Sequence, residues 1–589
     1  MGKGNRVRLE KAQQAAANQS VFTAKKQKKA APAWVSTLVV VLVIALLLSC
    51  VALTIVSDGG YVLRWTTVAE SEHYKVTGTM LSYYFYQSYS YFLSQFGTMA
   101  SYIGLDTNKS LKDQVSTYGE EEGTTWFDYF MEPAIEDVKS MLVYCEEAHK
   151  RGIKLEDEDR ATVDSALEAL EAQASEYGYT VSGFIAAMYG TGVKKSDVRA
   201  ALELSQLAVK CQEQIVDEIT LSVTDEDINV YYEANAVDFQ TAGVLSYTFT
   251  ATLGDDAEAF AQKKAEVKKH ADELAACKTV DEYKQYVLDY VADKNYATLY
   301  DKEVESLDPA LLPDEAAIAA RRQEIIEKAM ANALKGEGAE EIKTEDKVEA
   351  LFNEIEVDLT ETLANVAAGM YNERFTVAAD AEDEASLWIA EAARAAGDTK
   401  IIEVDETLAA DDAEDEEASD DKEDAKEYTA TVYMIAEPMH RDETPVRNVG
   451  HILFKPATYE NSAKAKAKAE EVLDQFLAGD KTREAFEKLA QQHTEDSSVF
   501  YDNVAPGQMV APFENWLFDE ARKDGDTGIV ETSYGHHIMY YLGEEADMPA
   551  WKYSVQSTIV NEKAEKWFTD NETTFEITIY EAKANKVNA

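Results

Sequence analysis

The chain has 589 residues, with 56 Lys and Arg against 110 Asp and Glu, so its formal net charge is −54. This length exceeds what one hydrophobic core organises, and we expect three or more folded units. Such an acidic surface excludes nucleic-acid binding, which requires clustered Lys and Arg, and favours basic partners or loosely held cations.

The first predicted element is a membrane anchor. Residues 1–33 are basic, with Glu10 as their single acid, and residues 34–56 carry no charge. At 1.5 Å per residue the uncharged stretch spans a hydrocarbon core of ~30 Å, and the basic tail sets a cytoplasmic N-terminus. A cleaved signal is one alternative, and a lipoprotein box ending at Cys50 is another. The apolar run continues past Cys50, which favours the uncut single-pass anchor, and in every case the bulk of the chain lies outside the cytoplasm.

Three cysteines follow the anchor: Cys145, Cys211 and Cys277. They form an odd set without CxxC spacing, which excludes a disulfide framework and a cysteine zinc site. Buried thiols are the expected state, and a Cys145–Cys211 bridge stays an open alternative.

Residues 57–237 predict a helical domain, because apolar residues recur at helical spacing between glycine stops. Its segment 81–96, "LSYYFYQSYSYFLSQF", is densely aromatic. We favour a core helix over a sticky chaperone surface, since so rich a strip cannot all be exposed on a soluble domain.

Residues 238–440 begin with a β-type segment, 242–251, followed by helical stretches to about residue 396. The acidic run 411–427 predicts a solvated loop, and it lacks the EF-hand pattern of alternating Asp with a central Gly. A strand is expected at 428–438.

Residues 441–545 show the clearest pattern, in the order strand, helix, helix, helix, strand, strand. Apolar residues of the first helix lie at i, i+3, i+4, i+7 and i+8, and Pro512 begins the third helix. This order predicts a small α+β domain, followed by a last helix at 551–568.

Four stretches of this domain, "GHILFK", "AFEKLAQQHTEDSS", "GQMVAPFENWLF" and "SYGHHIMYYL", resemble the parvulin family of peptidyl-prolyl isomerases in order and spacing. The resemblance implies a small antiparallel sheet and an X–Pro isomerase site. It assigns catalytic roles to His451, Asp496, His537 and Thr532, and a proline pocket to Met509 and Phe513. Strand alternation turns His536 away from His537. We interpret His536, His149 and His270 as solvent-facing.

One departure from the family concerns the loop before "GQM". Family members carry glycines there, whereas this chain has "SSVFYDNVAPGQM". The loop normally supplies an apolar wall, so Val499 or Phe500 is expected to line the pocket instead. An arginine-rich loop is also missing, so phosphate-directed specificity is not expected.

The whole chain resembles the extracytoplasmic foldases of the PrsA and SurA type, and we expect a multidomain α+β protein. In that arrangement residues 57–237 and the C-terminal segment 546–589 form one helical chaperone lobe, and 441–545 is the isomerase domain. Residues 238–440 are interpreted as a degenerate parvulin-like domain with a helical insertion, in which Ser246 takes the place of His451.

Two functions follow from these patterns. The first is a foldase that isomerises X–Pro bonds of exported polypeptides, and the second is a non-catalytic holdase or assembly factor with a decayed parvulin domain. Neither needs a cofactor, and His451 with His537 lacks further ligands for a metal. The expected partners are unfolded or partly folded exported polypeptides and the membrane, through the single N-terminal helix, with no nucleic acid.

Overall fold

The computed structural model describes residues 60–587, with gaps at 119–122, 253–256, 305–312, 336–337, 340–343, 345, 379, 409–424 and 497. The predicted basic tail, the anchor, Cys50 and most of the acidic run lie outside the described residues. Among the helices that are described, none combines the length and the apolar character of a membrane span.

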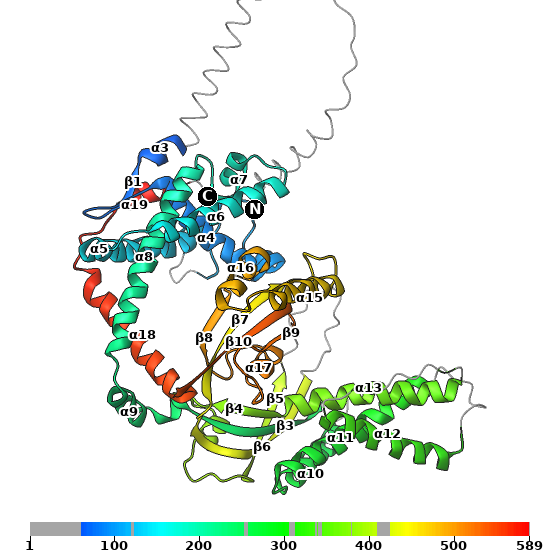
Figure 1. The fold of residues 1–589 in the computed structure, drawn as a ribbon. Helices are drawn as coiled ribbons and strands as arrows, with labels where there is room; N and C mark the ends of the chain where they lie inside the picture. Colours follow the sequence, from blue (N-terminus) through cyan, green and yellow to red (C-terminus); the bar gives the residue numbers. More distant parts are fainter. Residues whose placement is uncertain are drawn as a thin grey trace, which may run out of the picture. The chain divides into compact units, whose positions relative to one another are not determined.

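The described chain divides into two compact units, and the first joins segments from near both ends of the described chain. It contains the described residues up to Val223 and those from Val560 onward. The first segment therefore ends before the predicted boundary at residue 237, and the second begins after the predicted boundary at residue 546. Its helices and strands (Figure 1) are α3 (Gly60–Trp65), β1 (Thr67–Glu70), β2 (Lys75–Thr77), α4 (Gly78–Phe96), η1 (Gly97–Ser101), η2 (Leu111–Asp113), α5 (Trp126–Arg151), α6 (Asp157–Glu176), α7 (Val181–Tyr189), α8 (Lys195–Ser222), the end of α18 (Ala550–Glu572), β11 (Thr578–Ile579) and α19 (Glu581–Ala584).

The aromatic segment 81–96 lies on α4 and supplies the core of this unit. Thr77 caps the helix, Gly97 with φ 49° ends it, and Leu81, Phe85 and Phe92 are buried. Trp126 and Phe130 of α5 pack against Phe92, with ring centroids 5.4 and 5.3 Å away. The prediction of a core helix is therefore confirmed, although Tyr91 is 70% exposed.

The C-terminal segment completes the helical unit. Strand β11 pairs antiparallel with β1, with Ala69 opposite Ile579, and Trp567 stacks on Tyr144 at 5.5 Å. Cys145 and Cys211 are buried free thiols, so the alternative bridge between them is absent.

The second unit, Thr224–Ile559, holds two four-stranded antiparallel sheets with matching topology. One has the order β4-β3-β6-β5 and the other β8-β7-β10-β9. The elements are α9 (Asp225–Ala234), η3 (Ala236–Phe239), β3 (Gln240–Thr252), α10 (Ala257–Ala275), α11 (Val280–Val304), α12 (Glu315–Lys335), α13 (Lys347–Gly369), β4 (Tyr371–Thr376), α14 (Glu384–Ile389), β5 (Thr399–Leu408), β6 (Ala425–Arg441), β7 (Pro445–Phe454), α15 (Ser462–Ala478), α16 (Arg483–His493), β8 (Phe500–Val504), α17 (Ala511–Leu517), β9 (Thr527–Thr532) and β10 (Gly535–Pro549).

The two sheets also agree in register, so their residues can be equated. Ser246 lies opposite Tyr433 in the first sheet, and His451 lies opposite Met539 in the second. Two steps along, Thr248 lies opposite Thr431, and Leu453 lies opposite His537. We call residues 240–441 the first copy and 445–549 the second copy of one fold.

The two copies also share a turn in which an arginine contacts a tryptophan in the same way. In the second copy Arg522 donates to the carbonyl of Trp516 at 2.9 Å and lies over its ring. In the first copy Arg394 does the same to Trp388 at 3.0 Å. Gly397 and Gly525, each with φ 88°, end these turns, and both adopt a conformation that favours glycine.

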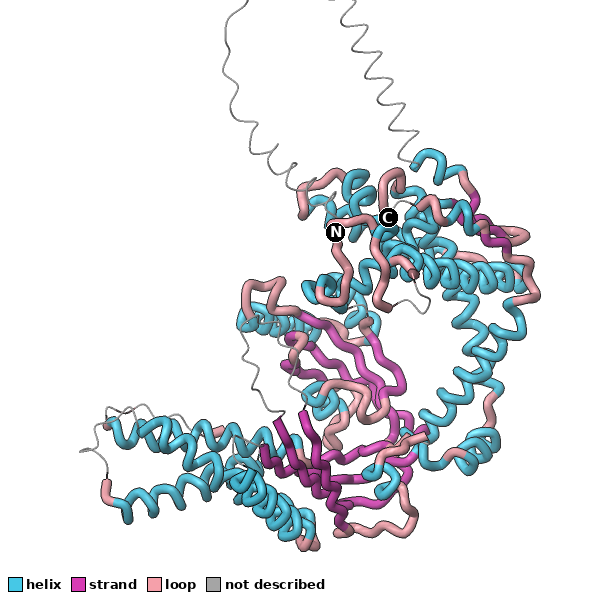
Figure 2. Tube along the Cα trace, turned by 180° about the vertical axis from the view of Figure 1, so that it is seen from behind, coloured by secondary structure: helices cyan, strands magenta, loops and turns pink. Residues whose placement is uncertain are grey.

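The copies differ by the helices α12 and α13, which lie between α11 and β4 of the first copy. In Figure 2 these helices extend away from the strands of their sheet. The corresponding position of the second copy holds only the short link from α16 to β8. Strand β8 was missed in the predicted element order, because a five-residue edge strand interrupts an otherwise loop-like sequence.

The second copy packs helices on both faces of its sheet. Ile452, Phe454 and Ile538 face one way, against α15 and α16. Val449, Met539 and Tyr541 face the other way, against α17. This alternation decides which side chains of β7 and β10 face α17.

Candidate active site

The two predicted histidines lie on adjacent strands of the second copy and face the same side. His451 is 1% exposed and His537 is 4% exposed. Their Nδ1 atoms are 3.1 Å apart, and their rings are stacked at 5.4 Å with an angle of 26°. Register places His537 opposite Leu453, two positions from His451, so the pair meets along a diagonal.

Thr532 and Asp496 extend this pair at its two ends. Thr532, at the end of β9, holds its Oγ1 2.9 Å from His537 Nε2 and accepts a hydrogen bond from the backbone N–H of Tyr534. Asp496 Oδ2 lies 3.9 Å from His451 Nε2. The structure thus brings all four predicted catalytic residues into one line.

The acidic end of the line favours one arrangement of protons. A proton on His451 Nε2 faces the Asp496 carboxylate, which leaves His451 Nδ1 as the acceptor. His537 then donates through Nδ1 and accepts the Thr532 hydroxyl proton at Nε2. The opposite arrangement would turn a nitrogen lone pair toward the carboxylate, which is electrostatically unfavourable.

Both imidazoles are neutral near pH 7. Burial, together with the neighbouring His451, lowers the pKa of His537 to about 4. Burial also lowers the pKa of His451, which the Asp496 carboxylate partly offsets. The site is therefore uncharged apart from Asp496 and is largely closed to water at the histidines.

The predicted pocket residues lie beside the histidine pair. Phe513, on α17, is buried and stands edge-on to both imidazoles, with centroids 5.6 Å away. Met509 lies half-buried in the same cluster, just before the helix that Pro512 helps to begin. Phe513 and Met509 thus form an apolar border beside the neutral imidazoles.

The fourth side of the site comes from Tyr501, which was not among the predicted site residues. Its ring stacks on His451 at 5.1 Å with an angle of 25°. Phe500 packs on the opposite face, with Phe486, and Val499 belongs to that cluster too, so the expectation that either of them lines the pocket is wrong. Strand alternation over 500–504 would have pointed to Tyr501 had β8 been recognised.

His536 points away from the site, as predicted, but it is buried rather than solvent-facing. It is 1% exposed, and its Nε2 lies 2.8 Å from the Ser462 hydroxyl at the start of α15. The helices on that face cover a side chain that was predicted to face solvent. His149 is exposed, and His270 is half-buried.

The loop that carries Met509 is held by hydrogen bonds to the side chain of Glu514. The Glu514 carboxylate accepts from the backbone N–H of Gly507 at 2.8 Å and from that of Met509 at 3.4 Å. Gln508 closes the same loop through its Oε1, which accepts from Ala505 N–H at 3.0 Å. These bonds give a shape to the loop that lacks the family's glycines.

The first copy shows which of these residues belong to the site rather than to the fold. Its equivalents of His451 and His537 are Ser246 and Thr431, and Thr431 bonds Thr248 at 2.8 Å. Counting back from the equivalent tryptophans, the partner of Phe513 is Ala385. The stacked Arg–Trp turn is common to both copies and is therefore part of the scaffold.

The chain resembles known proteins over this region. The family model described as "Rotamase: PPIC-type PPIASE domain" matches residues 451–542. No curated protein matches the sequence. Among solved structures, the peptidylprolyl isomerase PrsA from Bacillus cereus is 20% identical over 22% of this chain and 49% of its own, with a TM-score of 0.15. PrsA from Bacillus anthracis is 19% identical over 23% and 61%, also with a TM-score of 0.15.

The chain covers about half of the first PrsA structure and three fifths of the second, so the likeness is partial.

Among the described residues, no group of three or more His, Cys, Asp or Glu side chains could hold a metal ion. The residues that match the family model lie within the second copy. Residues 451–542 of this chain are therefore a PPIC-type, or parvulin, peptidyl-prolyl isomerase domain.

Proposed function

We propose that the protein is a membrane-anchored, extracytoplasmic foldase that isomerises X–Pro bonds in exported polypeptides. The observation that carries the proposal is the line Asp496–His451–His537–Thr532 beneath the Phe513 ring. The isomerase domain supports the reaction, and the basic and apolar sequence of residues 1–56 supports the location.

The reaction needs no covalent intermediate. An X–Pro bond has a rotational barrier near 20 kcal/mol, and a site lowers that barrier by binding the twisted amide better than either planar form. Phe513, Met509 and Tyr501 would hold the proline ring. The twisted amide is less delocalised and less polar, so a dry site with neutral imidazoles favours it over the planar forms.

The direct test is isomerisation of an X–Pro tetrapeptide by the wild-type chain and by Phe513→Ala, both shown to be folded. Loss of the aromatic wall should lower the catalysed rate by tenfold or more, mainly through weaker binding of the proline ring. A wild-type rate equal to the uncatalysed rate would remove the catalytic proposal.

The proposed location has a separate test. External protease added to intact cells should digest the 65.5 kDa chain and leave only a small protected N-terminal fragment. Trimming at Cys50 with incorporation of palmitate would establish the lipoprotein alternative instead. Complete protection of the chain would contradict both.

A holdase function is the second candidate, favoured by the exposed aromatic side chains of the helical unit. Tyr91 and Tyr102 are 70% and 86% exposed, and Met99 is 59% exposed. A His537→Ala chain that lacks isomerase activity should then still suppress aggregation of an unfolded model protein. If suppression is lost together with isomerisation, the helical unit is not a chaperone in its own right.

A further inference from the structure

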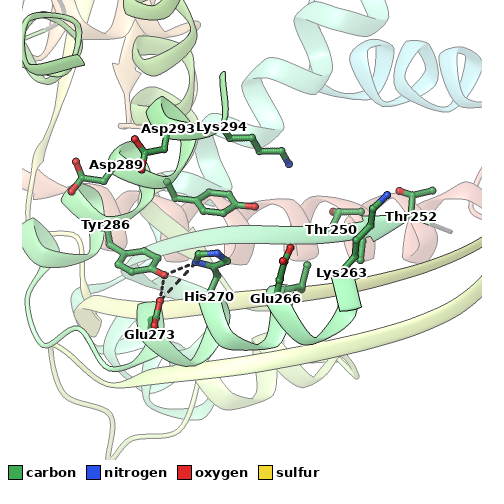
Figure 3. Close-up of a pocket in the computed structure, with 13 residues that line it drawn as sticks. Thr250, Thr252, Lys263, Glu266, His270, Glu273, Tyr286, Asp289, Asp293 and Lys294 are labelled. Atoms are coloured by element: carbon green, nitrogen blue, oxygen red, sulfur yellow. Dashed lines mark hydrogen bonds and ion pairs between the residues drawn. The ribbon is translucent and has the colours of Figure 1, made fainter. Parts of the chain in front are cut away.

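A groove of about 930 Å³ lies on the first copy, between α10, α11 and the carboxyl end of β3 (Figure 3). It is on the sheet face that carries Phe249 and Ala251, whereas Ser246, the equivalent of His451, belongs to the other face. The groove is therefore separate from the position that corresponds to the isomerase site.

The charges of the groove are separated along its length. Glu273 and Asp289 lie at one end and Lys263 at the other in Figure 3, with Lys294 on the same side as Lys263. Glu266 lies beside Lys263, so this end carries two ammonium groups against one carboxylate. Helical rise places Asp289 about 8 Å from Lys294 on α11, and Glu273 about 15 Å from Lys263 on α10. An extended chain covers these separations with about two to five residues.

Aromatic side chains form the middle of the groove. The Tyr290 ring lies edge-on to Phe249 at 4.9 Å and 4.7 Å from His270. The Tyr286 hydroxyl donates to Glu273 at 2.8 Å, so it accepts from His270 Nδ1, also at 2.8 Å. These bonds fix the positions of the Tyr286 and His270 rings, and the ring faces offer contact area to an apolar side chain.

Several charges at the two ends are available to a ligand. Lys263 makes no hydrogen bond or ion pair with any described residue, and Asp289 is bonded there only to the neutral Gln285, at 3.3 Å. Asp293 differs, because Arg322 pairs with it at 2.8 Å. The open carboxylate and the open ammonium group thus stand on either side of the aromatic centre.

We propose that this groove binds an extended polypeptide segment with a basic residue at one end, an apolar or aromatic residue in the middle and an acidic residue at the other end. The basic residue pairs with Asp289, and the acidic residue pairs with Lys263 and Lys294. The inference rests on the proposed function only in that the ligand is an unfolded polypeptide. It gives the first copy, which holds Ser246 and Thr431 at the positions of His451 and His537, a role in holding such chains.

The test uses the full chain and a fluorescein-labelled peptide, Gly-Arg-Leu-Phe-Glu-Gly, followed by fluorescence anisotropy. This peptide has no proline, so the isomerase site is not probed. Lys263→Gln with Lys294→Gln, and Asp289→Asn alone, should each weaken binding about two- to fivefold, within the range for exposed ion pairs. A peptide with Gln in place of both Arg and Glu should bind the wild-type chain and these variants equally weakly.

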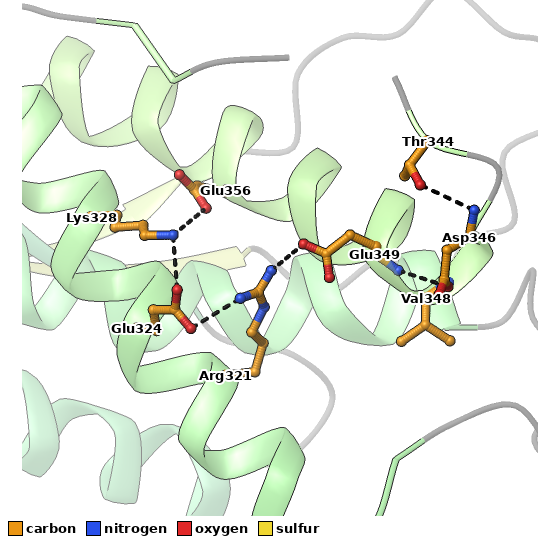
Figure 4. A network of polar contacts seen from close by, with 8 residues as sticks. All are labelled: Arg321, Glu324, Lys328, Thr344, Asp346, Val348, Glu349 and Glu356. Atoms are coloured by element: carbon orange, nitrogen blue, oxygen red, sulfur yellow. Dashed lines mark hydrogen bonds and ion pairs between the residues drawn. The ribbon is translucent and has the colours of Figure 1, made fainter. Parts of the chain in front are cut away.

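The matched control removes charges of both signs from the nearby helices without touching the groove. Arg321 bridges Glu324 and Glu349, and Lys328 bridges Glu324 and Glu356, so these residues hold α12 to α13 and are unsuitable (Figure 4). Lys347→Gln and Glu354→Gln lie on exposed positions of α13 outside that network.

Binding by the control variant should equal that of the wild type, and binding by His537→Ala should also be unchanged. The proposal is overturned if the wild-type chain does not bind the charged peptide, or if the groove variants bind it as tightly as the control does. Absence of isomerase activity in the wild type would remove the proposed catalysis and leave this result unaffected.

Discussion

Tyr501 stacks on His451, with ring centroids 5.1 Å apart and an angle of 25° between the rings. The contact joins the edge strand β8 to the histidine pair and gives the isomerase site an aromatic side opposite the Thr532 end. The equivalent position of Tyr501 in the first copy, by register, is Asn372. A ring at this place thus accompanies the histidines and is missing where they are missing.

Replacing Tyr501 with Ala should reduce kcat/KM for an X–Pro peptide by about tenfold, because one wall of the proline site is lost. Tyr501→Phe keeps the ring and should retain most of the rate, which separates stacking from a role of the hydroxyl. The protease-coupled isomerisation assay checks both variants. Equal rates for Ala and wild type would show that Tyr501 is outside the substrate site.

His537→Ala should abolish most of the activity, whereas His536→Ala should retain it, since His536 faces Ser462 on the opposite side of the sheet. Both residues are buried, so each substitution should also cost stability, on the order of 1–3 kcal/mol. Urea unfolding of the two variants supplies the control. A comparable loss of rate in two equally folded variants would contradict the assigned faces.

The low pKa of His537 predicts how stability depends on pH. The unfolded residue titrates near 6.5 and the folded one near 4, so the folded state binds fewer protons between these values. Stability from this group is complete above about pH 6.5 and is lost as the pH falls toward 4, by on the order of 3 kcal/mol. Unfolding midpoints of wild type and His537→Gln should therefore converge in acid, and parallel curves would contradict this prediction.

Glu514 is expected to position the Met509 loop without touching substrate. Glu514→Ala should raise KM about three- to tenfold with a smaller change in kcat, because Gly507 and Met509 lose a shared acceptor. Glu514→Gln keeps one acceptor oxygen, so its KM should lie between that of the wild type and that of Glu514→Ala. A fall in kcat alone, with KM unchanged, would assign Glu514 to another role.

Much of the second copy could be predicted from sequence, for reasons that particular residues make clear. Period-two alternation placed His451 and His537 on one face, and helical periodicity located α15 to α17. The burial of His536 could not be predicted, because it depends on α15 covering the sheet through Ser462. Tyr501 was missed because β8 is short and lies at an edge, where local pattern is weak.

The first copy was harder to recognise from sequence, since its helices α12 and α13 separate strands that pair in space. Ser246 was nevertheless placed at the position of His451, and the strand registers agree with that equivalence. Register is a property of paired strands, so only the structure could extend it to Thr431 and Asn372.

Two copies of one sheet within a single chain create a hazard during folding. Strands β6 and β10 are the last strands in sequence of two equivalent sheets, so a nascent chain could pair β6 with β7 and leave β10 to seek another partner. Sequence divergence opposes this exchange: in the swapped pairing the imidazole of His451 would face Tyr433, and Leu453 would lie opposite Thr431. These differences between the two copies therefore favour the pairing of each strand within its own sheet.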